Sequence, residues 1–307
     1  MTRARALAIL LALQCSAAAF ATQQPFRITA DTVVVTVSVR DPAGNTPPLK
    51  PEDFDVRDNG VRQTVEQAAV VDLPLDVTLL LPQTWWRHRP DGAGIVSAEL
   101  TKLSRESLRP SDRIRVVTSG PVEEMVPWRA GGLPIDLAAP TALEGGLADG
   151  LLIALSRRSV TERRQVVVMF EDRALERTSA LDPIRLPEAA RHAEATLYVI
   201  FGRPAWAPAV PAIVDIFVSR SGFTPGTPQM QGALQETARA TGGDAFASAK
   251  AELDLAGAFR DMLRDFRGTY MLGFNPTNPS PGWHELKVRV NGGQKLTVRA
   301  RSGYFRK

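Results

Sequence analysis

Hydrophobic and polar positions alternate with a period near two at both ends of this chain, a pattern typical of strands with one buried face. The pattern occurs in six segments: 32–40, 54–57, 61–65, 270–274, 284–290 and 296–301. Asn59-Gly60 separates the second from the third and supplies the positive φ angles that a tight hairpin turn requires. Each end is too small to bury a core alone, so we expect the two β segments to pack together as one β-sandwich.

The middle of the chain has a different pattern, in which short apolar runs alternate with segments of helical spacing. The expected strands are 77–81, 114–118, 166–170, 195–201 and 245–246, and the expected helices are 94–107, 147–155, 187–193, 231–241 and 253–266. Continuous apolar runs are typical of strands buried on both faces. This alternation predicts an α/β domain with a doubly wound, mostly parallel sheet. Its repeat is interrupted by the Pro-rich segment 203–228, an expected loop.

The N-terminus has the pattern of an export signal. Arg3 and Arg5 precede a short apolar run, and Ala19-Phe20-Ala21 fits a cleavage site. The run is shorter than the roughly 20 residues that span a bilayer. We therefore expect cleavage after Ala21 and a secreted or periplasmic protein with no membrane span, although an uncleaved anchor is the alternative. Cleavage would remove Cys15, the only cysteine.

The predicted organisation therefore has four parts. They are a signal peptide (1–21), an N-terminal β segment (22–75), an α/β domain (76–268, with 203–228 as its Pro-rich loop) and a C-terminal β segment (269–307). With 307 residues and 44% hydrophobic content, the chain can bury a sizeable core.

The charge balance is mildly basic, with a formal net charge of +4. Arg157-Arg158 and Arg163-Arg164 flank the turn before the strand at 166–170. Such pairs can attract phosphates or an acidic surface, but solvated loop residues are the interpretation that we favour. No nucleic-acid-binding motif accompanies them, so we expect no nucleic-acid partner.

Several short segments, each weak alone, are specific in their order and spacing: 35–41 (VTVSVRD), 52–60 (EDFDVRDNG), 240–243 (ATGG), 270–274 (YMLGF) and 299–304 (RARSGY). With them the chain resembles the secreted bacterial von Willebrand factor A-related proteins of the type found in acidobacteria. The resemblance covers nearly the whole chain after the leader. It implies an A-domain flanked by β segments, with no established catalytic role.

The resemblance also implies a metal-ion-dependent adhesion site (MIDAS), built from one Asp and two Ser of a first loop, a Thr of a second and an Asp of a third. The corresponding positions in this chain are Pro82, Thr84, Trp86, Gly145 and Asp172. One hydroxyl and one carboxylate, the latter beside Arg173, are too few oxygens for a hard cation. We therefore expect a degenerate site and no metal cofactor. Weak binding of Mg²⁺ through Thr84 and Asp172 is the alternative.

The same loop contains the most suggestive local cluster, Trp85, Trp86, Arg87 and His88. Exposed Trp and Arg are enriched at binding hot spots, and Trp206 of the Pro-rich loop could extend the same surface. We hypothesise that these residues contact an unidentified protein or cell-surface partner. In the alternative interpretation, one or both Trp fill the space left by the ion site, because Trp is usually largely buried.

Catalytic signatures are absent from the sequence. His88, His192 and His284 are scattered without metal-ligand spacing, and we expect His284, in an alternating strand, to face solvent. A triad could only assemble in space, for example from Ser119, His88 and Asp172. The expected function is therefore a secreted, non-enzymatic interaction module. The alternatives are a weakly cation-dependent adhesion module and a periplasmic hydrolase with an unrecognised site.

Overall fold

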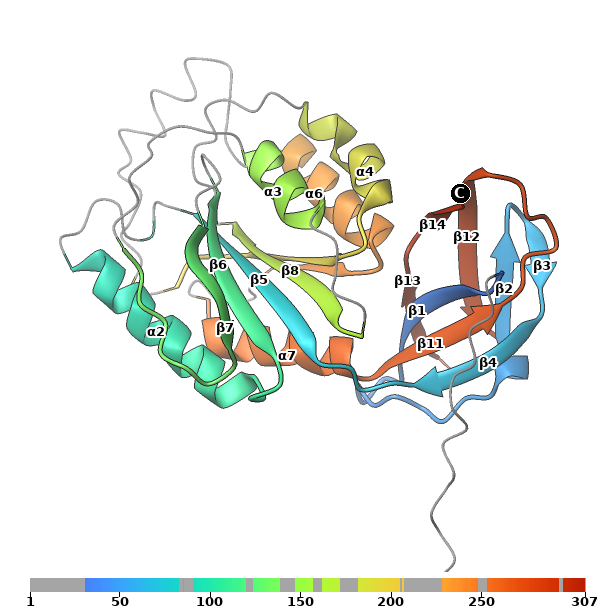
Figure 1. The fold of residues 1–307 in the computed structure, drawn as a ribbon, viewed down its shortest axis with the longest axis horizontal. Coiled ribbons are helices and arrows are strands. Elements are labelled where there is room, and N and C mark those ends of the chain that lie inside the picture. The colour runs from blue at the N-terminus through green and yellow to red at the C-terminus, as the bar shows by residue number, and fades with distance from the viewer. Residues whose placement is uncertain are drawn as a thin grey trace, which may run out of the picture. The chain divides into compact units, whose positions relative to one another are not determined.

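The structure is a computed structural model that describes residues 31–82, 85, 91–119, 124–138, 147–156, 162–171, 182–204, 206, 228–247, 253–292 and 295–306. The predicted signal peptide lies outside these residues. Asp31–Lys307 form one compact unit, in which the described strands make one sheet of six and two sheets of four (Figure 1). Among the described residues, no helix has both the length and the apolar character needed to cross a membrane.

The central sheet has the order β10-β9-β8-β5-β6-β7. Its strands are β5 (Leu75–Pro82), β6 (Arg113–Ser119), β7 (Glu124–Ala130), β8 (Arg164–Glu171), β9 (Thr196–Phe201) and β10 (Asp244–Ala247). Neighbours pair in parallel except β6 and β7. Counted along the chain, this is the order 3-2-1-4-5-6 of doubly wound folds. It confirms the predicted fold class and fits a von Willebrand factor A-like arrangement.

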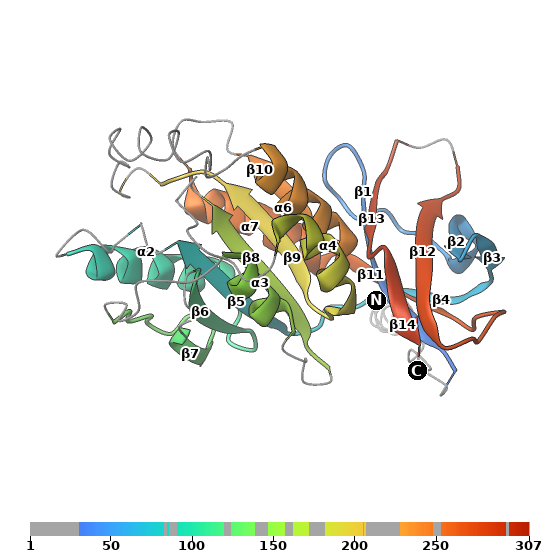
Figure 2. The same cartoon turned by 90° about the horizontal axis from the view of Figure 1, so that it is seen from above.

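Helices cover both faces of this sheet (Figure 1, Figure 2). They are α2 (Gly92–Ser107), α3 (Leu147–Ser156), α4 (Leu186–Ala189), α6 (Pro228–Ala240) and α7 (Leu255–Arg267), with 3-10 turns η1 (Pro51–Asp53), η3 (Pro183–Arg185) and η4 (Ala190–His192). The side chains of β5 alternate between the faces: Leu79 and Leu81 pack with α2 and α7, whereas Leu80 packs with α3 and α6. Burial on both faces explains why the strand is a continuous apolar run.

Strands from the two ends of the chain share the other two sheets, whose orders are β13-β1-β11-β4 and β14-β12-β2-β3. The strands are β1 (Val33–Arg40), β2 (Phe54–Asp58), β3 (Val61–Gln63), β4 (Val65–Val70), β11 (Thr269–Phe274), β12 (Gly282–Val290), β13 (Thr297–Ala300) and β14 (Gly303–Arg306). Side chains of both sheets, such as Val37 and Val56, meet in one core. The predicted β-sandwich is therefore confirmed, while the exact region boundaries stay predictions.

Two glycine-containing segments noted in the sequence occupy tight backbone positions. Asn59 and Gly60 have φ of 48° and 84°, the left-handed values that the predicted hairpin turn between β2 and β3 needs. At the end of α6, a Cβ on Gly243 would lie 1.8 Å from the carbonyl oxygen of Leu197. Only glycine fits there, because the backbone passes directly over the start of β9.

Asp265, near the end of α7, connects the β-sandwich to the central sheet. Its carboxylate accepts hydrogen bonds from the Ser38 hydroxyl of β1 at 2.7 Å and from the Tyr198 hydroxyl of β9 at 2.8 Å. It also pairs with Arg40 of β1 at 3.3 Å and with Arg299 of β13 at 2.5 Å. One buried carboxylate therefore holds groups from three strands and two sheets.

The arginine pair at 163–164 is structural and not a solvated loop, so our favoured interpretation of it was wrong. Arg163 Nε pairs with the 2%-exposed Asp76 at 2.5 Å, and its Nη2 donates to the carbonyl of Ser111 at 2.7 Å. Arg164 is buried against the ring of Phe266, and burial lowers its pKa to about 10. Arg164 is thus buried, and the Arg163 side chain is only 19% exposed. Arg157 and Arg158 lie outside the described residues.

His284 is also placed differently from the prediction that it faces solvent. Its side chain is 1% exposed and lies between Asp58 of β2 and Tyr304 of β14. The alternation along β12 was interpreted correctly as a strand, but the polar character of histidine suggested the wrong face. A buried carboxylate partner explains how the imidazole is accommodated in the sandwich.

Candidate functional site

The carboxyl edge of the central sheet is the place where doubly wound folds bind ligands, at the point where the strand order reverses. Here that point lies between β5 and β8, which are direct neighbours (Figure 2). β5 ends at Pro82 and β8 ends at Glu171, and both side chains are buried. We therefore examined this edge first for groups that could bind a metal or a partner.

Of the five positions that the resemblance assigns to a MIDAS, the structure describes only Pro82. Proline offers no side-chain oxygen, so this position does not fit a hard cation. Thr84, Trp86, Gly145 and Asp172 lie outside the described residues, as do the partner candidates Arg87 and His88. Within the ranges given above, no group of three or more His, Cys, Asp or Glu side chains is placed to hold a metal ion.

Trp85 is placed in the core at this edge. Its indole is 1% exposed and packs on Phe170 of β8, with ring centroids 5.5 Å apart, and edge-on against Trp206 at 5.4 Å. The proposal that Trp85 is a surface contact is thereby corrected in favour of the alternative, a Trp that fills the core. Trp206 is half-buried and remains a candidate contact residue.

This aromatic cluster, formed by Trp85, Phe170 and Trp206, determines what the described part of the edge can do. Aromatic rings supply packing area and hydrophobic surface, whereas divalent cations require several oxygens. Within the described residues, the aromatic cluster is therefore suited to apolar contacts, and the buried Glu171 at the end of β8 supplies one carboxylate at the same edge. The cluster presents none of the side-chain oxygens that the resemblance would place at Pro82.

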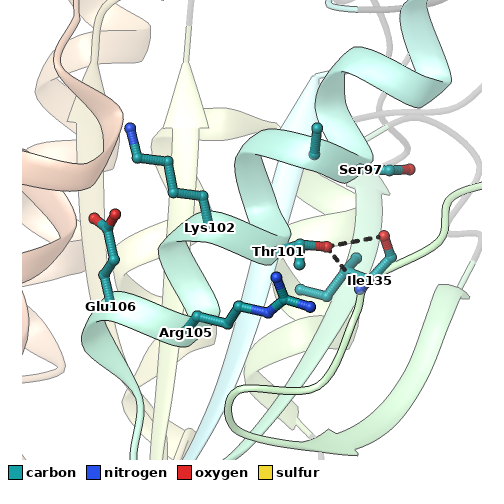
Figure 3. Close-up of a pocket in the computed structure, with 7 residues that line it drawn as sticks. Ser97, Thr101, Lys102, Arg105, Glu106 and Ile135 are labelled. Atoms are coloured by element: carbon teal, nitrogen blue, oxygen red, sulfur yellow. Dashed lines mark hydrogen bonds between the residues drawn. The ribbon is translucent and has the colours of Figure 1, made fainter.

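A second candidate surface was not anticipated from the sequence. A hollow of about 550 Å³ lies beside α2, lined by Ser97, Ala98, Thr101, Lys102, Arg105, Glu106 and Ile135 (Figure 3). The Lys102, Arg105 and Glu106 side chains are exposed. Because three of the side chains that line it are charged and exposed, the open hollow suits ion pairs with a polar partner.

The floor of this hollow is made by a row of hydroxyls along α2 that hold the segment after β7. Ser97 Oγ accepts from the backbone N–H of Leu137 at 2.9 Å, Thr101 Oγ1 from that of Ile135 at 2.9 Å, and Ser104 Oγ from that of Gly132 at 3.0 Å. Spacings of four and three residues put all three hydroxyls on one helix face. That spacing was visible in the sequence and was the signal that could have revealed them.

We expect Thr101→Val to lower the free energy of unfolding by about 1 kcal/mol, because the Ile135 N–H would lose its acceptor while side-chain volume is kept. Thr101→Ser keeps the hydroxyl and is the matched control, with a smaller expected loss. Equilibrium unfolding in urea measures both. Equal stability of Thr101→Val and the unmodified protein would contradict a role for the hydroxyl in holding this segment.

The histidines give no catalytic constellation in the described residues. His192 is exposed and stacks on Phe305 at 3.8 Å, whereas His284 is buried in the sandwich. The suggested triad of Ser119, His88 and Asp172 cannot be assessed, because His88, Asp172 and the Ser119 side chain lie outside what is described.

Comparison with known proteins gives structural similarity only. No family model matches the sequence, and no match was found among curated proteins. The ArnB paralog VWA2 from Sulfolobus acidocaldarius is 8% identical, with a TM-score of 0.41 over 91% of this chain and 76% of that one.

Two further solved structures have similarly low sequence identities and TM-scores. Proximal thread matrix protein 1 from the mussel byssus, with a zinc-occupied MIDAS motif, is 11% identical at a TM-score of 0.41 over 67% of this chain and 48% of its own. The manganese-loaded TRAP protein of Plasmodium vivax is 13% identical at a TM-score of 0.35, over 82% of this chain and 99% of its own. Because these TM-scores are below 0.5, the fold assignment rests on the strand order described above.

Proposed function

We propose that this protein is a secreted, non-enzymatic protein-interaction module with a von Willebrand factor A-like fold, and that its metal site has been lost. The observation that carries the proposal is the aromatic cluster at the sheet's switch point. Pro82 stands where the resemblance calls for the first Asp ligand, and Trp85, which follows in the same loop between two further ligand positions, is buried on Phe170. The proposed partner is a protein or cell-surface component, recognised without a bridging cation.

Secretion is a proposal that rests on the leader alone: Arg3 and Arg5, the apolar run after them and the Ala-Phe-Ala site. Expression of the full chain, followed by fractionation and intact mass measurement, tests it separately. The expected product begins at residue 22. A chain that keeps residues 1–21 and remains with the membrane would instead support the anchor interpretation.

A metal titration tests the lost site. We expect no heat of binding when the exported protein is titrated with Mg²⁺, Mn²⁺ or Ca²⁺, and no change in melting temperature on adding a chelator, because too few oxygens converge. The matched control is Pro82→Asp combined with Trp86→Ser, which restores two of the missing ligands. Saturable binding by the unmodified protein, with a raised melting temperature, would instead establish the cation-dependent adhesion module.

The partner-binding surface is proposed to include Trp206, which is half-buried on the aromatic cluster and available in part to solvent. Trp206→Ala should reduce capture of a partner on the immobilised protein while leaving the fold intact. Lys102→Ala in the α2 hollow is the comparison variant. If only Lys102→Ala reduces capture, the interaction surface lies at α2 and not at the carboxyl edge.

A further inference from the structure

A buried histidine cluster in the β-sandwich has a geometry that depends on protonation. His284 of β12 lies opposite Tyr304 of β14 in the strand register, with the two rings stacked at 5.0 Å. Its Nδ1 is 2.8 Å and 3.0 Å from the two carboxylate oxygens of Asp58. The Tyr304 hydroxyl donates to the same carboxylate at 2.8 Å. The cluster thus ties together three neighbouring strands, β2, β12 and β14 (Figure 1).

The contact made by the second ring nitrogen of His284, Nε2, determines the charge of the imidazole ring. Nε2 of His284 lies 2.7 Å from the backbone carbonyl oxygen of Ser280. A carbonyl oxygen and an ionised carboxylate are both acceptors only. Each ring nitrogen must therefore carry a hydrogen to satisfy its contact, and only the imidazolium cation has both. A neutral ring would leave one nitrogen lone pair facing an oxygen lone pair.

The surrounding charges favour the cation. Among the described residues, the groups facing His284 are Asp58 on β2 and Tyr304 and Arg306 on β14, and Arg306 itself pairs with Asp31 at 3.1 Å. Burial lowers the pKa of His284. The Ser280 carbonyl and the Asp58 carboxylate raise it and outweigh burial and the smaller opposing effect of Arg306, so the pKa lies above 6.5.

We propose that His284 is a pH-sensitive clasp: the protonated ring fastens the 275–281 loop to the sandwich, and loss of its Nε2 proton releases the loop at Ser280. A histidine whose pKa is raised by folding stabilises the folded state fully below its unfolded pKa. That contribution disappears as the pH rises through the folded pKa. The loop is therefore fastened below the midpoint of the His284 titration and freed above it. The Asp58 contact is kept, because Nδ1–H remains.

The loop has a second attachment that does not involve the histidine. The backbone N–H of Thr277 donates to Gln63 Oε1 at 3.0 Å, and Gln63 Nε2 donates to Thr277 Oγ1 at 3.1 Å. Neither contact changes with protonation of an imidazole. Release is therefore expected at the Ser280 end of the loop and not at the Thr277 end, which supplies an internal control.

The test is an NMR titration of the folded full chain labelled with ¹⁵N-histidine, from about pH 5 to pH 9, which brackets the ordinary histidine pKa of about 6.5. The chain has three histidines, and His284→Gln identifies the His284 signals. We expect both ring nitrogens of His284 to be protonated at pH 6 and the midpoint of its titration to lie above 6.5. A neutral His284 ring at pH 6, or a titration midpoint at or below 6.5, would overturn the proposal.

Hydrogen exchange then tests the release. After correction for intrinsic rates, we expect the amides of Ser280 and Gly282 to exchange roughly tenfold faster above the midpoint than below it, since a hydrogen bond to a charged group is lost. The Thr277 amide should not change. Equal acceleration at Thr277, or none at Ser280 and Gly282, rejects loop release. The hydrogen-exchange measurement uses the unmodified protein alone, so a poorly folding His284→Gln variant leaves this test intact.

Discussion

Asp265→Ala is expected to lower the free energy of unfolding by about 3–5 kcal/mol, the cost of removing one partner from a buried ion cluster. The side chain is 7% exposed, and Arg40 beside it is 8% exposed. Without the carboxylate, Arg40 and Arg299 would retain their charge in a poorly solvated site. The hydroxyls of Ser38 and Tyr198 would also lose their acceptor. Equilibrium unfolding in guanidinium chloride measures the loss.

The position of Asp265 adds a second expected result. Ser38, Arg40 and Arg299 belong to the β-sandwich strands, whereas Tyr198 belongs to the central sheet. We therefore expect Asp265→Ala to weaken the coupling between these parts, so that unfolding followed by separate probes gives non-coincident transitions. The unmodified protein should show coincident ones.

Asp261→Ala, on the same helix, is the matched control. Asp261 is exposed and makes an i,i+3 pair with Arg264 at 3.4 Å, and exposed pairs of this kind contribute at most about 1 kcal/mol. Asp265→Asn keeps two polar atoms but removes the charge. Its loss of stability should fall between those of Asp265→Ala and Asp261→Ala. An Asp265→Ala protein as stable as Asp261→Ala would show that the buried cluster contributes little to joining the sheets.

The sequence predicted most of the elements because their signals are local, but the strands β4, β7 and β14 were not predicted. β5 is largely apolar because both its faces are buried in apolar cores, and β1 alternates because Val35, Val37 and Val39 face the core of the sandwich. Asn59-Gly60 specifies its own turn through backbone conformation. Pairing of the two chain ends was also inferred correctly, since neither end could bury a core alone.

The polar residues were predicted poorly because their placement depends on partners far away in the chain. Asp265 is 227 residues from Ser38, and His284 is 226 residues from Asp58. Periodicity puts a residue on a face of its own strand or helix, but it does not show which charge that face will meet. His284, at an alternating position, was therefore expected to face solvent, although it is buried beside Asp58.

The candidate site was predicted in part. Pro82 could be placed at the end of β5, since that strand is predicted from local sequence, whereas its interpretation as a lost ligand position rests on the family resemblance. Whether Trp85 points outward or inward could not be decided from the sequence, because a loop residue has no periodicity to follow. Its burial depends on Phe170 and Trp206, which come from β8 and from the Pro-rich segment.

Trp85→Ala is accordingly expected to cost about 3–5 kcal/mol of folding stability, the range for removing a large buried aromatic side chain. The loss combines the transfer energy of the ring with a cavity at the carboxyl edge, between Phe170 and Trp206. Urea unfolding and thermal melting measure it. Trp206→Ala should cost less, because Trp206 is only half-buried and leaves a smaller void.

Trp85→Phe separates packing from polarity. The indole Nε1 is buried and finds no hydrogen-bond acceptor among the residues that the structure describes. Trp85→Phe would therefore leave no described acceptor unsatisfied. Its loss of folding stability should come from the smaller side-chain volume alone and should be well below the loss for Trp85→Ala. If Trp85→Ala were as stable as the unmodified protein but lost partner binding, Trp85 would be a contact residue after all. If it loses stability, reduced binding by that variant reflects disruption of the carboxyl edge, and the contact surface must be sought at Trp206 and the positions around it.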